Sequence, residues 1–160
     1  MTKVNHIPRF VYQEFKRRVK PQKVMILLGA RRVGKTELIK KYLSELNPAD
    51  YQFHNGEDQN TWKLFDERTV QNYKRILGNT KLLVIDEAQK IPDIGAKLKL
   101  MIDSIEGLSI IATGSSVFDL TNKLGEPLVG RANTLRLFPL AQMEVDPLEN
   151  HFETTVNLEE

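Results

Sequence analysis

The 160-residue sequence contains no cysteine and only three histidines. Without cysteine the chain can form neither a disulfide framework nor a thiolate metal site, which fits the reducing cytoplasm. The histidines His6, His54 and His151 are far apart in the sequence and make no ligand-spaced pair. We therefore interpret them as surface or loop residues rather than metal ligands.

Long apolar runs are also absent from the sequence. None approaches the roughly 18 residues of a membrane span, and residues 1–6 lack the apolar core of a signal peptide. We therefore expect a cytoplasmic protein without a membrane partner. The composition, 41% hydrophobic and 28% charged, is typical of a soluble globular chain, and the length predicts one domain.

Charge is unevenly distributed along the chain. The first 50 residues hold 12 Lys/Arg against 4 Asp/Glu, whereas the last 20 hold 6 acidic residues and no basic one. A basic front can attract nucleic acid or nucleotide phosphates. The alternative is a solvated helix face, which we favour because no nucleic-acid-binding motif accompanies the charge. We expect residues 1–145 to form the core and residues 146–160 an acidic, poorly ordered tail.

A phosphate-binding pattern occupies residues 29–36, which read Gly-Ala-Arg-Arg-Val-Gly-Lys-Thr. Five apolar residues precede it and a helical pattern follows, the order that a phosphate-binding loop (P-loop) requires. Lys35 would reach the β- and γ-phosphates, and the Thr36 hydroxyl would ligate Mg²⁺. The alternative is a glycine-containing turn before an ordinary helix. The predicted nucleotide-binding residues are Gly29, Ala30, Arg31, Arg32, Val33, Gly34, Lys35, Thr36 and Glu37.

Two acidic residues end the apolar run at residues 82–85. Asp86 is placed to hold Mg²⁺ through water, and Glu87 to orient or deprotonate an attacking water molecule. A buried strand with a solvated acidic end would give the same pattern. The P-loop about fifty residues upstream favours the functional interpretation.

A further apolar run at residues 109–113 ends in Gly114-Ser115-Ser116. A polar side chain there would lie beside Asp86 and could hydrogen-bond the γ-phosphate or the water molecule. The alternative is a helix N-cap from Ser115 or Ser116.

Apolar runs alternate with amphipathic segments, which predicts an α/β fold with a mostly parallel five-stranded sheet between two helical layers, as in P-loop NTPases. The expected strands are residues 24–28, 51–54, 81–85, 109–113 and 133–138. Helices are expected over residues 9–19, after the P-loop, over 60–77 with a break near 67–68, between 91 and 107, over 117–124 and over 140–145. The nucleotide should lie over the carboxyl ends of the strands.

Together, residues 29–36, residues 83–89, residues 112–116, and Gly130-Arg131 before Phe138-Pro139-Leu140 resemble the core of AAA-type ATPases. The chain is most similar to bacterial and archaeal members that carry a nuclease-like domain after the core. That domain and the usual helical lid are missing before Glu160, so we expect a truncated chain that hydrolyses nucleotide slowly.

The resemblance implies ATP and Mg²⁺ as ligands, with Asp86 on the metal and Glu87 as the base. Ser115, or Thr113, matches the position that senses the γ-phosphate. Arg131 matches an arginine finger, which acts from a neighbouring subunit and would imply a homo-oligomer. The alternative for Arg131 is an ordinary surface or salt-bridged arginine.

The function that we predict is Mg²⁺-dependent ATP hydrolysis coupled to a mechanical or switching task. A nucleotide-gated nucleic-acid-binding module is the main alternative. A GTPase is disfavoured because residues 86–89 lack the D-x-x-G pattern and residues 122–125 lack the aspartate of N-K-x-D. A small-molecule kinase is disfavoured because no arginine-rich lid is evident.

Overall fold

The computed structural model describes residues 9–115 and 127–138. The helices are α1 (Arg9–Arg18), α2 (Lys35–Ser44), α3 (Gln59–Asp66), α4 (Val70–Leu77) and α5 (Ile94–Ser104), with short 3₁₀ helices η1 (Pro48–Asp50) and η2 (Ala88–Lys90). The strands are β1 (Val24–Leu28), β2 (Tyr51–Asn55), β3 (Leu82–Asp86), β4 (Ser109–Gly114) and β5 (Ala132–Arg136). Within these residues no helix is long and apolar enough to cross a membrane.

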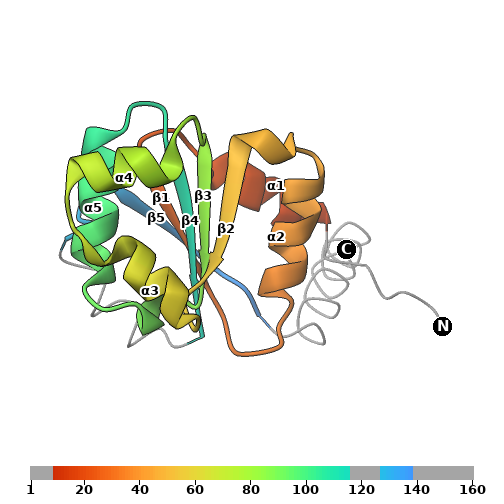
Figure 1. Cartoon of the computed structure of the whole chain (residues 1–160). Helices are drawn as coiled ribbons and strands as arrows, with labels where there is room; N and C mark the ends of the chain where they lie inside the picture. The colour runs from red at the N-terminus through yellow and green to blue at the C-terminus, as the bar shows by residue number, and fades with distance from the viewer. Residues whose placement is uncertain (1–8, 116–126, 139–160) are drawn as a thin grey trace, which may run out of the picture.

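The strands form one parallel sheet in the order β2-β3-β4-β1-β5. Helices α1 and α2 cover one face of this sheet, and α3, α4 and α5 cover the other (Figure 1). This arrangement confirms the predicted three-layer α/β fold.

The interior strand β1 has buried side chains on both faces of the sheet. Successive side chains of a strand point to opposite faces, so Val24, Ile26 and Leu28 join the core under α3–α5. Met25 and Leu27 join the second core, under α1 and α2. This double burial explains why the strand is a continuous apolar run, as is typical of parallel sheets.

The strand order places β4 between β3 and β1. Thr113 in β4 is in register with Leu27 in β1, and Ala112 is in register with Ile85 in β3. Because the three strands are parallel, their carboxyl ends lie on the same side of the sheet, and the segments that follow them leave from that side. The P-loop after β1 therefore lies next to the polar ends of β3 and β4.

Most element boundaries differ from the predicted ones by only one or two residues. Strands β3 and β4 run one residue further than expected, and β5 ends at Arg136 rather than Phe138. The expected break within residues 60–77 is confirmed: α3 and α4 are separate helices, and Thr69 caps α4 by accepting a hydrogen bond from the Asn72 amide. The helices expected over 117–124 and 140–145, and the tail, lie outside the described residues.

Helix α1 is held to the sheet by Phe15, whose side chain is fully buried. Its ring meets that of Tyr42 edge-on, with the ring centroids 5.4 Å apart. We expect Phe15→Ala to lower the free energy of unfolding by about 3–5 kcal/mol, because it removes a large buried ring. Urea denaturation followed by circular dichroism measures this change. Arg17→Ala on the exposed side of α1 is the control, and an equal effect of the two substitutions would contradict the packing role.

Candidate functional site

The loop between β1 and α2 depends on two glycines for different reasons. Gly34, at the start of α2, has φ +96°, a conformation that other residues rarely adopt. At Gly29 the limit is space, since a Cβ there would lie 2.7 Å from the Leu137 carbonyl oxygen. Glycine is therefore required at position 34 by backbone conformation and at position 29 by close packing.

A cavity of about 370 Å³ opens between this loop, the start of α2 and the end of β3. Its lining residues are Arg31, Arg32, Gly34, Lys35, Thr36, Glu37 and Glu87. Most of the predicted nucleotide-binding residues thus share one cavity with the predicted catalytic acid. Gly29, Ala30 and Val33 do not line it, and the Val33 side chain is buried in the core under α1 and α2.

The ammonium group of Lys35 is turned onto its own loop. Its Nζ donates hydrogen bonds to the carbonyl oxygens of Gly29 at 2.5 Å and Ala30 at 3.0 Å, and only 6% of the residue is exposed. Burial lowers the pKa of Lys35, while the carboxylates of Glu87 and Asp86 act in the opposite direction. An anion beside Nζ would therefore stabilise the charged form of this group.

The side chains of Asp86 and Thr36 lie close together beside the cavity. The Thr36 hydroxyl lies 3.5 Å from Asp86 Oδ2, and the other carboxylate oxygen accepts a 2.5 Å hydrogen bond from the hydroxyl of Thr113. The Thr113 hydroxyl also accepts a hydrogen bond from the Glu87 amide at 3.0 Å. Thr113 is one of the two residues considered for the sensor position. Its hydroxyl is already hydrogen-bonded to both acidic residues at the end of β3.

The peptide between Asp86 and Glu87 is fixed from the neighbouring strand as well. Glu87 has φ 50° and ψ 48°, a left-handed conformation that is uncommon outside glycine. The Gly56 amide donates to the Asp86 carbonyl at 2.6 Å, and a Cβ at Gly56 would lie only 2.2 Å from the Glu87 carbonyl oxygen. The Trp62 indole donates in turn to the Gly56 carbonyl.

Sequence reasoning missed two residues at this site. Neither Gly56 nor Gln89 was given a role. In the structure Gln89 Nε2 donates to Glu87 Oε2 at 2.6 Å, and Ser115 Oγ lies 3.4 Å from the same oxygen. The position of Gly56 directly after a predicted strand could have drawn attention to it. Only the strand order, however, shows that this strand lies next to β3.

The two arginines of the loop lie at the rim of the cavity. Arg31 Nη2 is 3.8 Å from Glu57 Oε1, and both side chains are more than half exposed. An exposed pair of this kind contributes at most about 1 kcal/mol. The Arg31 side chain is therefore free to exchange this partner for another anion.

Arg131 lies at the amino ends of the strands, whereas the cavity lies at their carboxyl ends. Its carbonyl accepts a hydrogen bond from the amide of Val24, the first residue of β1. Its Nε is 2.7 Å from Asp103 Oδ1 at the end of α5, and this hydrogen bond lowers the pKa of Asp103. The structure does not bring Arg131 to the cavity of its own chain, so an arginine-finger role requires a second subunit.

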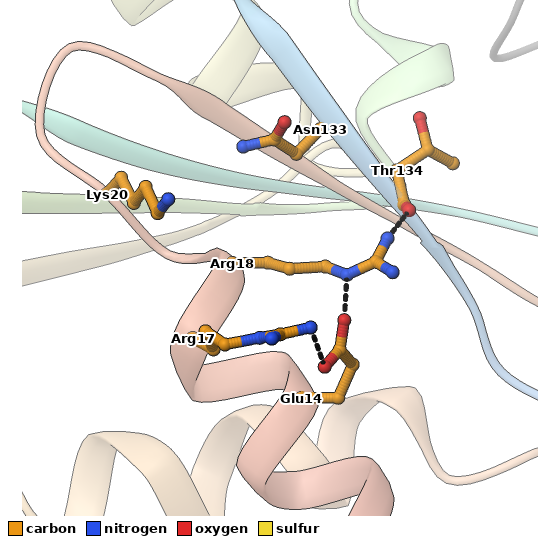
Figure 2. Close-up of a pocket in the computed structure, with 6 residues that line it drawn as sticks. All are labelled: Glu14, Arg17, Arg18, Lys20, Asn133 and Thr134. Carbon is orange, nitrogen blue, oxygen red and sulfur yellow. Dashed lines mark hydrogen bonds and ion pairs between the residues drawn. The ribbon is translucent and has the colours of Figure 1, made fainter.

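A second hollow, of about 290 Å³, lies between the end of α1 and the edge strand β5 (Figure 2). Glu14 accepts hydrogen bonds at 2.6 Å from both Arg17 and Arg18, and Arg18 also donates to the Thr134 carbonyl. Arg18 thus covers an outward-facing carbonyl of the edge strand, a device that discourages pairing with another chain. Glu14 offsets one of the three positive charges that line the hollow, those of Arg17, Arg18 and Lys20.

Comparison with known proteins identifies the family. Residues 21–146 match a family model described as an AAA domain. The chain belongs to this family. The predicted AAA-type P-loop core is therefore confirmed.

Relatives of this AAA domain include an uncharacterized protein of Methanocaldococcus jannaschii, 29% identical over 75% of the chain. Uncharacterized proteins of Mycobacterium bovis and Mycobacterium tuberculosis are 28% identical over 76% of it. The chain spans only 27% of the archaeal protein and 26% of each mycobacterial protein.

Solved structures with a similar fold include domain III of the Thermotoga maritima replication initiation protein DnaA. It has a TM-score of 0.56 and 15% identity, and the match covers 84% of this chain and 61% of that one. A DNA replication initiation factor has a TM-score of 0.59 and 12% identity, and the match covers 91% of this chain and 49% of that one. At these identities the likeness shows the fold alone.

The close approach of Gly56 to Glu87 predicts the effect of adding a methyl group to this AAA domain. In Gly56→Ala the new Cβ must displace the Asp86–Glu87 peptide, so the hydrogen bond from the Glu87 amide to Thr113 should weaken. Hydrogen exchange of the Glu87 amide should then be faster. Gly78→Ala is a matched control, because Gly78 has φ +52° but no atom within 4 Å of an added Cβ. Unchanged exchange in Gly56→Ala would contradict the packing argument.

Proposed function

We propose that this AAA domain binds ATP with Mg²⁺ and hydrolyses it to drive a mechanical or switching task. One observation carries the proposal: Lys35 and Thr36 share a single cavity with Glu87, and Asp86 lies beside Thr36. These are the residue types that phosphate binding, metal binding and water activation require. The family supports the same conclusion.

The P-loop and Lys35 would bind the phosphates. Lys35 Nζ now contacts two loop carbonyls, which phosphate oxygens can replace. Arg31 and Arg32 add positive charge at the rim. The exposed pair between Arg31 and Glu57 can open without a large loss of stability.

Thr36 and Asp86 fit a magnesium ion. Mg²⁺ takes oxygen ligands in octahedral geometry, commonly one or two carboxylates with waters and substrate phosphates. Residues 9–115 and 127–138 contain no group of three or more acidic or histidine side chains able to hold a metal. Phosphate oxygens and waters would therefore complete the coordination. The ion would neutralise charge that develops on the phosphates.

Glu87 would act on the attacking water molecule. Its amide is fixed by Thr113 and its carboxylate by Gln89, so the side chain is positioned before substrate binds. Adenine is favoured over guanine because residues 86–89 and 122–125 lack the D-x-x-G and N-K-x-D patterns.

Two substitutions separate binding from chemistry. Lys35→Ala should weaken binding of a fluorescent ATP analogue, because it removes the cation nearest the phosphates. Glu87→Gln should leave binding intact and lower phosphate release by about 10²–10⁴-fold, the usual contribution of a general base. Lys40→Ala, at an exposed position on α2, serves as the control. Undiminished turnover by Glu87→Gln would refute the role of Glu87, and tighter binding of GTP than ATP would refute the nucleotide assignment.

Arg131 is proposed as an arginine finger that completes the site of a neighbouring subunit. Arg131→Ala and Lys35→Ala should then each be inactive alone. A mixture of the two should recover part of the phosphate release, since some interfaces combine an intact cavity with an intact finger. Wild-type activity of Arg131→Ala would show instead that the ion pair with Asp103 is its whole role.

Nucleotide-gated binding of nucleic acid is the second candidate function. It is supported by the basic side chains at the end of α1 (Figure 2) and by the fold shared with proteins named for replication initiation. Binding to single- or double-stranded DNA should fall with added salt. If no DNA binding occurred at low salt, with or without ATP, this candidate would be excluded.

We also propose that the chain belongs to the subgroup whose members carry a nuclease-like domain after the core. This proposal rests on the sequence motifs alone.

A further inference from the structure

Gln89 is buried beside Glu87 and belongs to none of the phosphate-binding elements. Only 5% of the residue is exposed. It lies on η2, the short turn that follows the two acidic residues. The left-handed conformation of Glu87 begins this turn, and the Lys90 amide closes it by donating to the Glu87 carbonyl at 3.1 Å. The turn brings the side chain at position 89 back towards position 87.

The contacts of the Glu87 carboxylate are one-sided. Gln89 Nε2 lies 2.6 Å from Oε2, and Ser115 Oγ lies 3.4 Å from the same atom. Gln89 Nε2 is also 3.4 Å from Ser115 Oγ, which links the three side chains. In the part of the chain that the structure describes, no donor contacts Oε1. Among the described residues, the contacts thus hold Oε2, and none of them competes with a water molecule for Oε1.

We propose that Gln89 is a positioning residue for Glu87 in ATP hydrolysis, an inference that rests on the proposed function. The amide fixes Oε2, and the fixed carboxylate presents Oε1 to the attacking water. In the reaction the water gives a proton to Oε1 while its oxygen bonds to the γ-phosphorus. The bond between that phosphorus and the bridging oxygen breaks, and ADP leaves with the bond's electron pair.

The distances assign the larger share of this task to Gln89 rather than Ser115. A 2.6 Å contact is a short, charge-assisted hydrogen bond, whereas 3.4 Å is near the limit for a hydroxyl donor. Burial adds to the difference, because a buried amide that lost its acceptor would incur a desolvation cost. The short contact with Gln89 Nε2 therefore restricts the orientation of the Glu87 carboxylate more than the contact with Ser115 does.

Gln89→Met tests the proposal, because methionine keeps the length of the side chain and removes the donor. We expect kcat to fall by about 10- to 100-fold, the cost of a misplaced catalytic group. The Kd for a non-hydrolysable ATP analogue with Mg²⁺ should stay within about two-fold, since Gln89 does not line the cavity. A fall in affinity as large as the fall in kcat would show a structural role and overturn the proposal.

A double mutant tests whether Gln89 acts through Glu87. In the Glu87→Gln background, Gln89→Met should cause little further loss of kcat, because residues that act as a unit are not additive. A second readout needs no turnover: the side-chain amide resonance of Gln89 in nucleotide-free protein should shift on Glu87→Ala. Additive losses of kcat, or an unmoved resonance, would refute the coupling.

Gln52→Met is the matched control. Gln52 is a part-buried glutamine of β2 that donates to the Ile76 carbonyl and to Thr80, both at 2.9 Å. Its loss should lower the melting temperature and leave kcat unchanged. If the wild type released no phosphate, hydrolysis itself would be refuted and this inference with it. If the wild type hydrolysed ATP and Gln89→Met matched its kcat, only the inference would be refuted.

Discussion

The hydroxyl of Thr113 joins the ends of two neighbouring strands, and the geometry of the site depends on this joint. It donates to Asp86 Oδ1 and accepts from the Glu87 amide, so one buried group orients both acidic residues. A hydrogen bond to a carboxylate is stronger than one between neutral groups. With Oδ1 occupied, the other oxygen of Asp86 is left facing Thr36. The joint exists because the chain folds β4 between β3 and β1.

The same region stores local strain. A left-handed non-glycine residue such as Glu87 costs on the order of 1–3 kcal/mol and persists only when its surroundings hold it. The Glu87 amide is held by Thr113, and the Glu87 carboxylate is held by Gln89. The Asp86 carbonyl, just before Glu87, accepts a hydrogen bond from the Gly56 amide. These contacts come from three different segments of the chain. Backbone strain that is held in place by several segments of the chain is typical of functional sites. Here it fixes the direction of the Glu87 side chain.

The sequence was informative wherever local pattern decides the structure. The apolar runs of β1 and β3 and the break between α3 and α4 follow from burial on both faces and from capping at Thr69. Strand order does not follow from local pattern, because periodicity identifies strands but not their neighbours. Gly56 and Gln89 acquire their contacts only from that order and from the turn after Glu87. A salt-bridged Arg131 was the alternative that the sequence offered, but its partner Asp103 could not be named, since 28 residues separate the two.

The phosphate binding that we propose for the cavity would need no extensive rearrangement of Lys35. Burial lowers its pKa, which means that the fold has already removed part of the water around the ammonium group. The carbonyls of Gly29 and Ala30 compensate only in part, because neutral acceptors interact less strongly with a cation than an anion does. A phosphate that displaced them would regain interaction energy without a second desolvation of the lysine. The free-energy cost of partly desolvating the Lys35 ammonium group is therefore incurred when the protein folds and not when a ligand binds. This is the general advantage of a preorganised site.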